Sequence, residues 1–172
     1  MSSSNLQEAT VCYAAFLRAL GLSESDTSIE ESARSTSELM ASWMRGVEES
    51  RPELSLMEAP DARAVEIRDV PFYSFCAHHF VPFFGTVSIL YFPEHHIAGL
   101  GGFSRVIEYY ARRPQFQERL GTQIAQHLFD ELCPKALRVQ LSARQMCLEL
   151  QGKGNQIVVN TSHVLGDDAL IQ

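Results

Sequence analysis

Residues 76–85 read Cys76-Ala77-His78-His79-Phe80-Val81-Pro82-Phe83-Phe84-Gly85, directly after a segment with the pattern of a β-strand. Cys76 and His79 are three positions apart, so a turn can direct the thiol and the imidazole toward one point. A thiolate with an imidazole is half of the ligand set that tetrahedral Zn²⁺ uses in proteins. The alternative is a buried cysteine beside two hydrogen-bonded histidines. A third ligand elsewhere in the chain would favour the metal site.

The overall composition excludes several classes of protein. A chain of 172 residues fits one domain with a sizeable hydrophobic core. The formal net charge of −7 argues against a general nucleic-acid or anionic-membrane surface, because both need an excess of basic residues. No apolar run approaches the roughly 18 residues of a membrane span, and the first residues lack the basic segment of a signal peptide. We therefore expect a cytoplasmic protein whose four irregularly spaced cysteines are reduced thiols.

The first 60 residues are predicted to form a helical segment. Apolar residues at helical spacing predict a helix over residues 6–20, which ends at Gly21. Ser28 and Glu31 have the spacing of a capping box and open a second helix that runs to Gly46. A loop is expected to follow.

From residue 61 onward the pattern is that of a second, mixed region. The segments that alternate or are rich in β-branched residues, and so predict strands, are 65–70, 86–92, 137–142, 145–150 and 157–159. Two helices are predicted among them, at 103–112 and 116–132, after a flexible glycine-rich crossing at 97–102. This order indicates an α+β protein with an antiparallel sheet, helices on one face and a neighbouring subunit on the other.

Cys147 is the candidate third metal ligand. If residues 145–150 form a strand, Gln145, Cys147 and Glu149 share one face. A thiol among polar residues is in an unusual place for a side chain that serves only packing.

The stretch at 76–85 resembles the C-E-H-H-x-x-P-F-x-G signature of the GTP cyclohydrolase I family. The other segments that carry the resemblance are Gly99-Leu100, Arg105-Val106-Ile107, residues 110–120 and Met146-Cys147. It implies a tunnelling fold (T-fold), with two helices on one face of an antiparallel sheet plus N-terminal helices. It also implies a catalytic domain at 61–172, and a homodecamer of two pentamers with active sites at subunit interfaces.

The family's site residues carry over onto matching positions. The resemblance implies Zn²⁺ held by Cys76, His79 and Cys147. It implies that His78 shuttles protons. The positions that match substrate-binding residues are Gln117 and Glu118, which read the guanine edge, and Arg105, which binds phosphate.

The reaction implied by the family is the hydrolysis of carbon–nitrogen bonds in a cyclic amidine. Water adds to C8 of the guanine imidazole ring, and the C8–N9 bond breaks. A second hydrolysis releases C8 as formate. Rearrangement of the ribose then gives 7,8-dihydroneopterin triphosphate.

The sequence departs from the family at the phosphate-binding positions. The family's Gly-Leu-Ser-Lys is Gly99-Leu100-Gly101-Gly102 here, and an expected arginine is Gln151. Of that phosphate cluster only Arg105 matches. Each charge-assisted contact is worth about 1.5–3 kcal/mol, so the loss of two cations weakens triphosphate binding by orders of magnitude. The alternative is compensation by Lys153, Arg138 or Arg144.

Two further departures lie near the expected metal. Gln145 replaces a catalytic histidine; glutamine can hydrogen-bond but cannot transfer a proton near neutral pH. Ala77 replaces an acidic residue that would support a neighbouring histidine.

These observations favour a divergent zinc-dependent cyclohydrolase that opens the imidazole ring of a guanine-type purine without a triphosphate. Guanine, 8-oxoguanine and a nucleoside are candidate substrates. The first alternative is an orthodox GTP cyclohydrolase I. The second is a non-catalytic purine-binding regulatory subunit. A nitrile reductase of the same fold is disfavoured, because its reactive-cysteine context and a nicotinamide motif are absent from the sequence.

Overall fold

The computed structural model describes residues 3–47, 50–61, 63–153 and 156–171. It divides into two compact units, Met1–Arg45 and Gly46–Gln172. Within the described ranges, no helix has the length and apolar character that crossing a bilayer requires.

The N-terminal unit consists of α1 (Ser3–Ala19) and α2 (Ile29–Trp43), as the apolar spacing predicted. Its small core is built from Ala14, Ile29 and Ala33.

The predicted capping box of α2 is wrong. Ser28 is the N-cap residue, but its side chain makes no capping hydrogen bond to this helix. The Glu24 carboxylate instead accepts from the Ile29 N–H at 3.3 Å, so a residue of the preceding turn supplies the cap. Without a hydrogen bond from the Ser28 side chain, Ser28 and Glu31 do not form a capping box.

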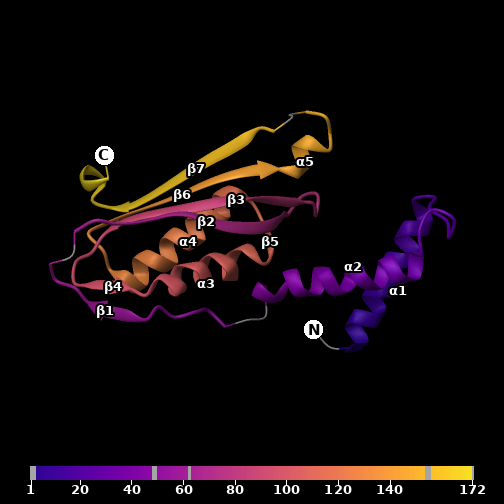
Figure 1. The fold of residues 1–172 in the computed structure, drawn as a ribbon, viewed down its shortest axis with the longest axis horizontal. Helices are drawn as coiled ribbons and strands as arrows, with labels where there is room; N and C mark the ends of the chain where they lie inside the picture. Colours follow the sequence, from indigo (N-terminus) through magenta and orange to yellow (C-terminus); the bar gives the residue numbers. More distant parts are fainter. Residues whose placement is uncertain (1–2, 48–49, 62, 154–155, 172) are drawn as a thin grey trace. The chain divides into compact units, whose positions relative to one another are not determined.

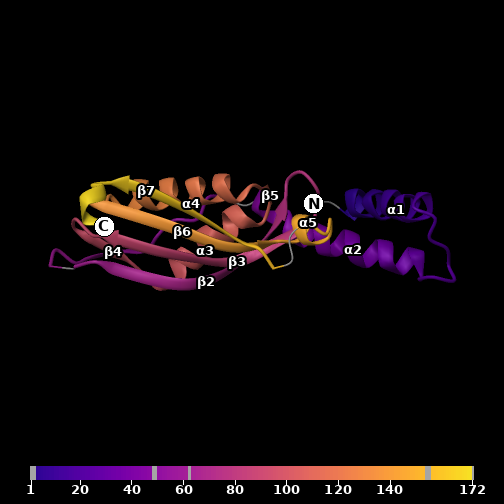
Figure 2. The same ribbon diagram turned by 90° about the horizontal axis from the view of Figure 1, so that it is seen from above.

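The C-terminal unit is built on a five-stranded sheet of order β5-β2-β3-β6-β7 (Figures 1 and 2). Its strands are β2 (Val65–Cys76), β3 (Pro82–Phe92), β5 (Pro114–Gln115), β6 (Ala136–Gln145) and β7 (Val158–Gly166). All neighbours are antiparallel except β5, which pairs in parallel with the end of β2. A separate pair, β1 (Leu56–Glu58) with β4 (His96–Ala98), was not predicted.

Two helices, α3 (Leu100–Ala111) and α4 (Gln117–Leu132), cover one face of the sheet (Figure 2). The core between the two layers is continuous and aliphatic-rich. It includes Phe103, Val106, Leu120, Ile124, Leu128, Val87, Ile89, Val139 and Leu141, each at most 1% exposed. This is the α+β arrangement that the sequence predicted.

Two local predictions are wrong. Residues 97–102 are not a flexible crossing, because α3 begins at Leu100 and includes both following glycines. Gly102 is buried there, and a Cβ atom would approach the Leu54 side chain to 2.8 Å.

The predicted strand at 145–150 is also wrong, because β6 ends at Gln145 and Met146–Glu149 forms the short helix α5. The Arg144 guanidinium donates twice to the Glu149 carboxylate, at 2.9 and 2.7 Å. This bidentate ion pair spans five residues and requires the chain to turn back on itself. Two-residue periodicity in such a short segment could not distinguish that turn from a strand.

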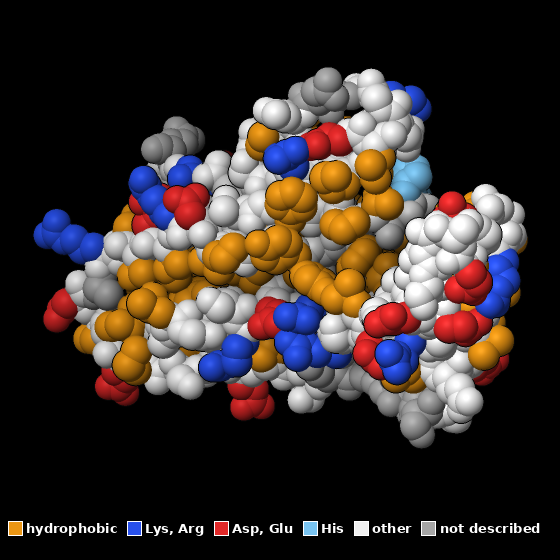
Figure 3. Space-filling view, turned by 45° about the vertical axis from the view of Figure 1, so that its right-hand side comes forward, with side chains coloured by type: hydrophobic (Ala, Val, Ile, Leu, Met, Phe, Trp, Pro, Cys, Tyr) orange, Lys and Arg blue, Asp and Glu red, His pale blue; other side chains and the backbone are white. Residues whose placement is uncertain are grey.

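Apolar side chains remain exposed on this unit. They include Tyr73, Phe80, Leu150, Ile157 and Val158, at 47–69% exposure. Figure 3 shows hydrophobic side chains gathered into a broad band on one face of the molecule. Exposed apolar surface of this kind marks contacts with other molecules.

Gly85, in the middle of β3, is required by a close approach of β6. A Cβ atom at Gly85 would overlap the Ser142 carbonyl oxygen and lie 2.7 Å from Ala143 Cα. Gly85→Ala should lower the free energy of unfolding by about 1–3 kcal/mol, because the obstacle is backbone. Gly99→Ala is the control, since no atom lies within 4 Å of its added Cβ. Denaturant unfolding measures both; equal stability of the two variants would contradict this packing.

A buried polar cluster joins α4 to the chain that precedes β1. His127 Nδ1 lies 3.2 Å from the Tyr110 hydroxyl, and Nε2 lies 3.1 Å from Glu131 Oε1. The second Glu131 carboxylate oxygen accepts from the Leu54 N–H at 2.7 Å. Burial, and after it the positive charge of Arg51, lowers the pKa of His127.

This shift predicts an acid-sensitive term in stability. The unfolded chain binds the His127 proton more readily than the folded chain, so stability is lost as pH falls below about 6.5. His127→Gln should reduce that pH dependence, and His95→Gln, in an exposed turn, should not. Urea unfolding from pH 7.5 to 5 measures the slope. An unchanged slope in His127→Gln would refute the assignment.

Candidate metal centre and active site

A tight turn at the end of β2 brings two potential ligands together. The Phe80 N–H donates to the Cys76 carbonyl, and the Cys76 N–H donates to the Val81 carbonyl, both at 2.9 Å. Phe80 adopts a positive φ of 53° inside this turn. The turn returns His79 toward the strand, so that its Nδ1 lies 3.6 Å from Cys76 Sγ.

Cys147 completes the cluster from the first turn of α5. One ligand atom from each of Cys76, His79 and Cys147 lies within 4.8 Å of the others. Burial, and after it the neighbouring Cys76 sulfur, raises the pKa of the Cys147 thiol. Two sulfurs and an imidazole directed at one point are the donor set of a protein zinc site. The residues present therefore fit Zn²⁺.

The cluster opens into a cavity of about 300 Å³. Its lining residues come from β2, the following turn, β5, α4, β6, α5 and β7: Cys76, His78, His79, Gln115, Phe116, Gln117, Glu118, Gln145, Cys147, Leu148 and Val159. Seven of the eight residues singled out from the sequence are among them. Arg105 is the exception: it is exposed on α3 and does not line this cavity.

His78 packs against an aromatic wall. Its ring centroid is 4.6 Å from that of Phe116, and the two rings are tilted by 55°. The Arg119 guanidinium lies 5.1 Å from the same Phe116 ring centroid. Arg119 Nε donates to Gln115 Oε1 at 2.6 Å, which fixes the guanidinium. Sequence reasoning did not assign Phe116 or Gln115 to the site. Their position beside Gln117 in one quoted motif was the available signal.

Two glutamines are joined at the centre of the cavity wall. Gln145 Nε2 donates to Gln117 Oε1 at 2.7 Å. Gln117 is only 4% exposed, and its own Nε2 donates to the Val159 carbonyl at 2.8 Å and to the Leu141 carbonyl at 3.3 Å. Gln145 is therefore held by a buried amide.

The cations proposed as substitutes for the missing phosphate ligands have other partners. Arg144 is paired with the Glu149 carboxylate, and Arg138 donates to the Ile171 carbonyl at 3.1 Å. Lys153 Nζ donates to Gln151 Oε1 at 2.8 Å, and Gln151 Nε2 lies 3.4 Å from His79 Nε2. Lys153 thus has a neutral partner near the cavity.

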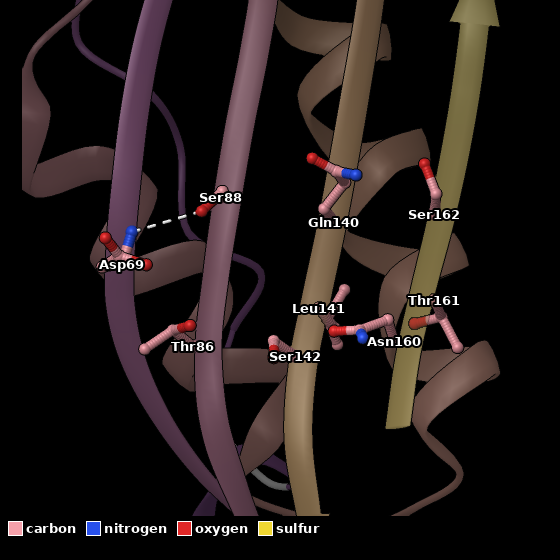
Figure 4. Close-up of a pocket in the computed structure, with 9 residues that line it drawn as sticks. All are labelled: Asp69, Thr86, Ser88, Gln140, Leu141, Ser142, Asn160, Thr161 and Ser162. Carbon is pink, nitrogen blue, oxygen red and sulfur yellow. Dashed lines mark hydrogen bonds between the residues drawn. The ribbon is translucent and has the colours of Figure 1, made fainter. Parts of the chain in front are cut away.

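A second hollow, of about 310 Å³, lies on the sheet itself (Figure 4). Its lining is mostly hydroxyl and amide side chains from four adjacent strands: Asp69, Thr86, Ser88, Gln140, Leu141, Ser142, Asn160, Thr161 and Ser162. This lining offers a single carboxylate and no thiol or imidazole. Metal-assisted chemistry therefore belongs to the first cavity.

Comparison with known proteins gives matches over most of the chain. The model of the family GTP cyclohydrolase I matches residues 9–169. A protein named GTP cyclohydrolase 1 from Nitrosospira multiformis is 38% identical over 159 residues, 88% of this chain and 82% of that protein. A Streptococcus agalactiae protein of the same name is 34% identical over 140 residues, 80% of this chain and 75% of that protein.

Among solved structures, an archaeosine synthase QueF-like protein in the apo form is similar with a TM-score of 0.52. The match covers 62% of this chain and 97% of that chain at 16% identity, so it bears on the fold alone. The fold is consistent with a T-fold, as expected. The chain belongs to the GTP cyclohydrolase I family, zinc-dependent hydrolases that act on carbon–nitrogen bonds in cyclic amidines.

Proposed function

We propose that the protein is a zinc-dependent cyclohydrolase that opens the imidazole ring of a guanine-type purine at C8. The substrate lacks the triphosphate and is guanine, 8-oxoguanine or a nucleoside. The observation that carries the proposal is the single cavity that holds the Cys76–His79–Cys147 cluster, His78 and Glu118. This supports the proposal because the candidate metal ligands, the candidate proton carrier and the candidate purine-binding residue line one cavity.

Cys76, His79 and Cys147 would hold the metal. Three protein ligands leave a fourth position open, which is the pattern of catalytic zinc. Zinc held in this way supplies a Lewis acid that makes water acidic near neutral pH.

The chain's own residues would bind the purine and move protons. The Glu118 carboxylate accepts from N1–H and the 2-amino group of guanine, which adenine does not offer in that arrangement. His78, held against Phe116, transfers a proton to the ring nitrogen as the C8–N9 bond breaks. For an unoxidised guanine, one water opens the ring to a formamidopyrimidine, and a second water releases formate and leaves an amine. For an 8-oxopurine, whose C8 is at the oxidation level of a urea, one water opens the ring to a carbamate, which loses CO2 and leaves the same amine.

The positions of the cations support a substrate without a triphosphate. Gly101, Gly102 and Gln151 offer no positive charge. Arg144 is neutralised by Glu149, so Arg105 is left as the one cation that matches the family's phosphate cluster. A triphosphate carries about four negative charges that charge-assisted contacts must offset. A neutral base or nucleoside needs none of them.

One observation favours an orthodox GTP cyclohydrolase I as the second candidate. Lys153 lies near the cavity with a neutral partner, Gln151, and could turn toward a phosphate. A non-catalytic purine-binding subunit is disfavoured, because it would not need three zinc-type ligands at one point.

We also propose that the site is completed in a homodecamer of two pentamers, with active sites between subunits. The exposed apolar side chains on the sheet unit support an interface. β7 and the first part of β2 are sheet edges that a neighbouring copy could extend. Arg105, on another part of the unit, would then reach a neighbour's cavity.

A substrate panel tests the proposed reaction. Zinc-loaded protein is incubated with GTP, guanosine, guanine and 8-oxoguanine, and ultraviolet loss, formate and product mass are measured. We expect ring opening of at least one unphosphorylated purine, at about 10²-fold or greater kcat/KM than GTP, because two charge-assisted contacts are missing. Neopterin triphosphate formed from GTP faster than any other product would instead identify the orthodox enzyme.

The ligand assignment has its own test. Cys147→Ala should reduce bound zinc from about one per chain to near zero and abolish ring opening, because two ligands hold zinc poorly. Cys133→Ala is the matched control, since this exposed thiol lies outside the cluster. Metal is measured by elemental analysis of purified protein. Full zinc content in Cys147→Ala would remove Cys147 from the ligand set.

A further inference from the structure

The buried amide of Gln117 has its orientation fixed by the backbone. Its Nε2 faces the carbonyl oxygens of Leu141 and Val159, at 3.3 and 2.8 Å. Carbonyl oxygens can only accept hydrogen bonds, so the amide nitrogen must face them. The Gln117 side-chain oxygen therefore faces the opposite way, toward Gln145.

The orientation of Gln145 follows from that of Gln117. Because Gln117 Oε1 can only accept, Gln145 must approach it with its nitrogen, and it does so at 2.7 Å. The side-chain oxygen of Gln145, Oε1, takes no part in this hydrogen bond. Among the residues that the structure describes, none donates a hydrogen bond to Gln145 Oε1. Gln145 is only half-buried and lines the cavity, so this oxygen is available to a ligand.

Gln145 lines the same cavity as the candidate metal ligands and Glu118. It precedes the metal-ligand candidate Cys147 by two residues, and it contacts Gln117, the neighbour of Glu118. A purine with C8 at the metal and its pyrimidine edge at Glu118 would carry its five-membered ring past Gln145. The ring nitrogen N7 would then face a fixed acceptor.

We infer that the Gln117–Gln145 amide pair makes this site selective for 8-oxopurines over unoxidised purines. In guanosine N7 is a bare acceptor, so two acceptors would face each other. In 8-oxoguanosine N7 carries a hydrogen and can donate to Gln145 Oε1. The inference rests on the proposed purine-opening function and narrows its substrate class. Gln145 is here a specificity-determining residue.

Binding of matched nucleosides tests this selectivity. Dissociation constants for guanosine and 8-oxoguanosine are measured by calorimetry on the zinc-loaded full chain, and ring opening is followed separately. We expect 8-oxoguanosine to bind about tenfold to a hundredfold more tightly, the range for a paired against an unpaired buried acceptor. Gln145→Leu should abolish the preference and keep zinc content close to wild type, while the loss of the donor to the buried Gln117 Oε1 lowers the melting temperature.

Gln140→Leu is the control, because this glutamine is on the same strand but lines the hollow in Figure 4. It should keep the wild-type preference. Equal binding of the two nucleosides, or a preference that survives Gln145→Leu, overturns the inference. If guanosine is nevertheless opened, the proposed function stands without it. If zinc-loaded protein neither binds nor opens any guanine-type purine, the proposed function falls and the selectivity with it.

Discussion

The backbone hydrogen bonds that close the turn after β2 are the constraint on which the site depends. They link Cys76 to Phe80 and to Val81, and they hold His79 beside the Cys76 sulfur. β2 in turn is fixed by long antiparallel pairing with β3 and by the short parallel contact with β5. Because the same parallel contact pairs Gln115 with Cys76, Gln115 and the start of α4 lie at the cavity. The candidate metal ligands and the helix end that carries Gln117 and Glu118 are therefore positioned by one corner of the sheet.

Most of the fold could be predicted because its long elements repeat a clear pattern. α4 and β6 have the periodicities of a helix and a strand over at least ten residues each. The features that were predicted wrongly are short elements or depend on side-chain contacts from outside the element. α5 is four residues long and is stabilised by the Arg144–Glu149 ion pair, while the α2 cap comes from Glu24. Periodicity carries no information about such contacts.

The site shows the same division between local and distant information. Cys76 and His79 could be paired from spacing alone, because one turn joins them. Cys147 was selected for its place on a strand that does not exist, yet it lies within ligand distance of both. The polar surroundings that made the thiol unusual were informative even though the assumed backbone was wrong. The Gln117–Gln145 pair joins a helix to a strand and could not be read from either segment.

The candidate metal ligands and the glutamines beside them differ in what fixes their chemistry. At the metal end, backbone geometry brings together three donors, and each donor type is already suited to zinc. Beside this cluster, Gln151 and Gln145 stand where the family has a phosphate-binding arginine and a proton-carrying histidine. The Gln117 amide donates to two backbone carbonyls, so it cannot turn over without breaking buried hydrogen bonds. Its donor and acceptor atoms therefore keep fixed positions. Gln145, which stands where the family has a histidine, takes its orientation from this anchored amide, so the replacement exchanges proton transfer for discrimination between hydrogen-bonding patterns.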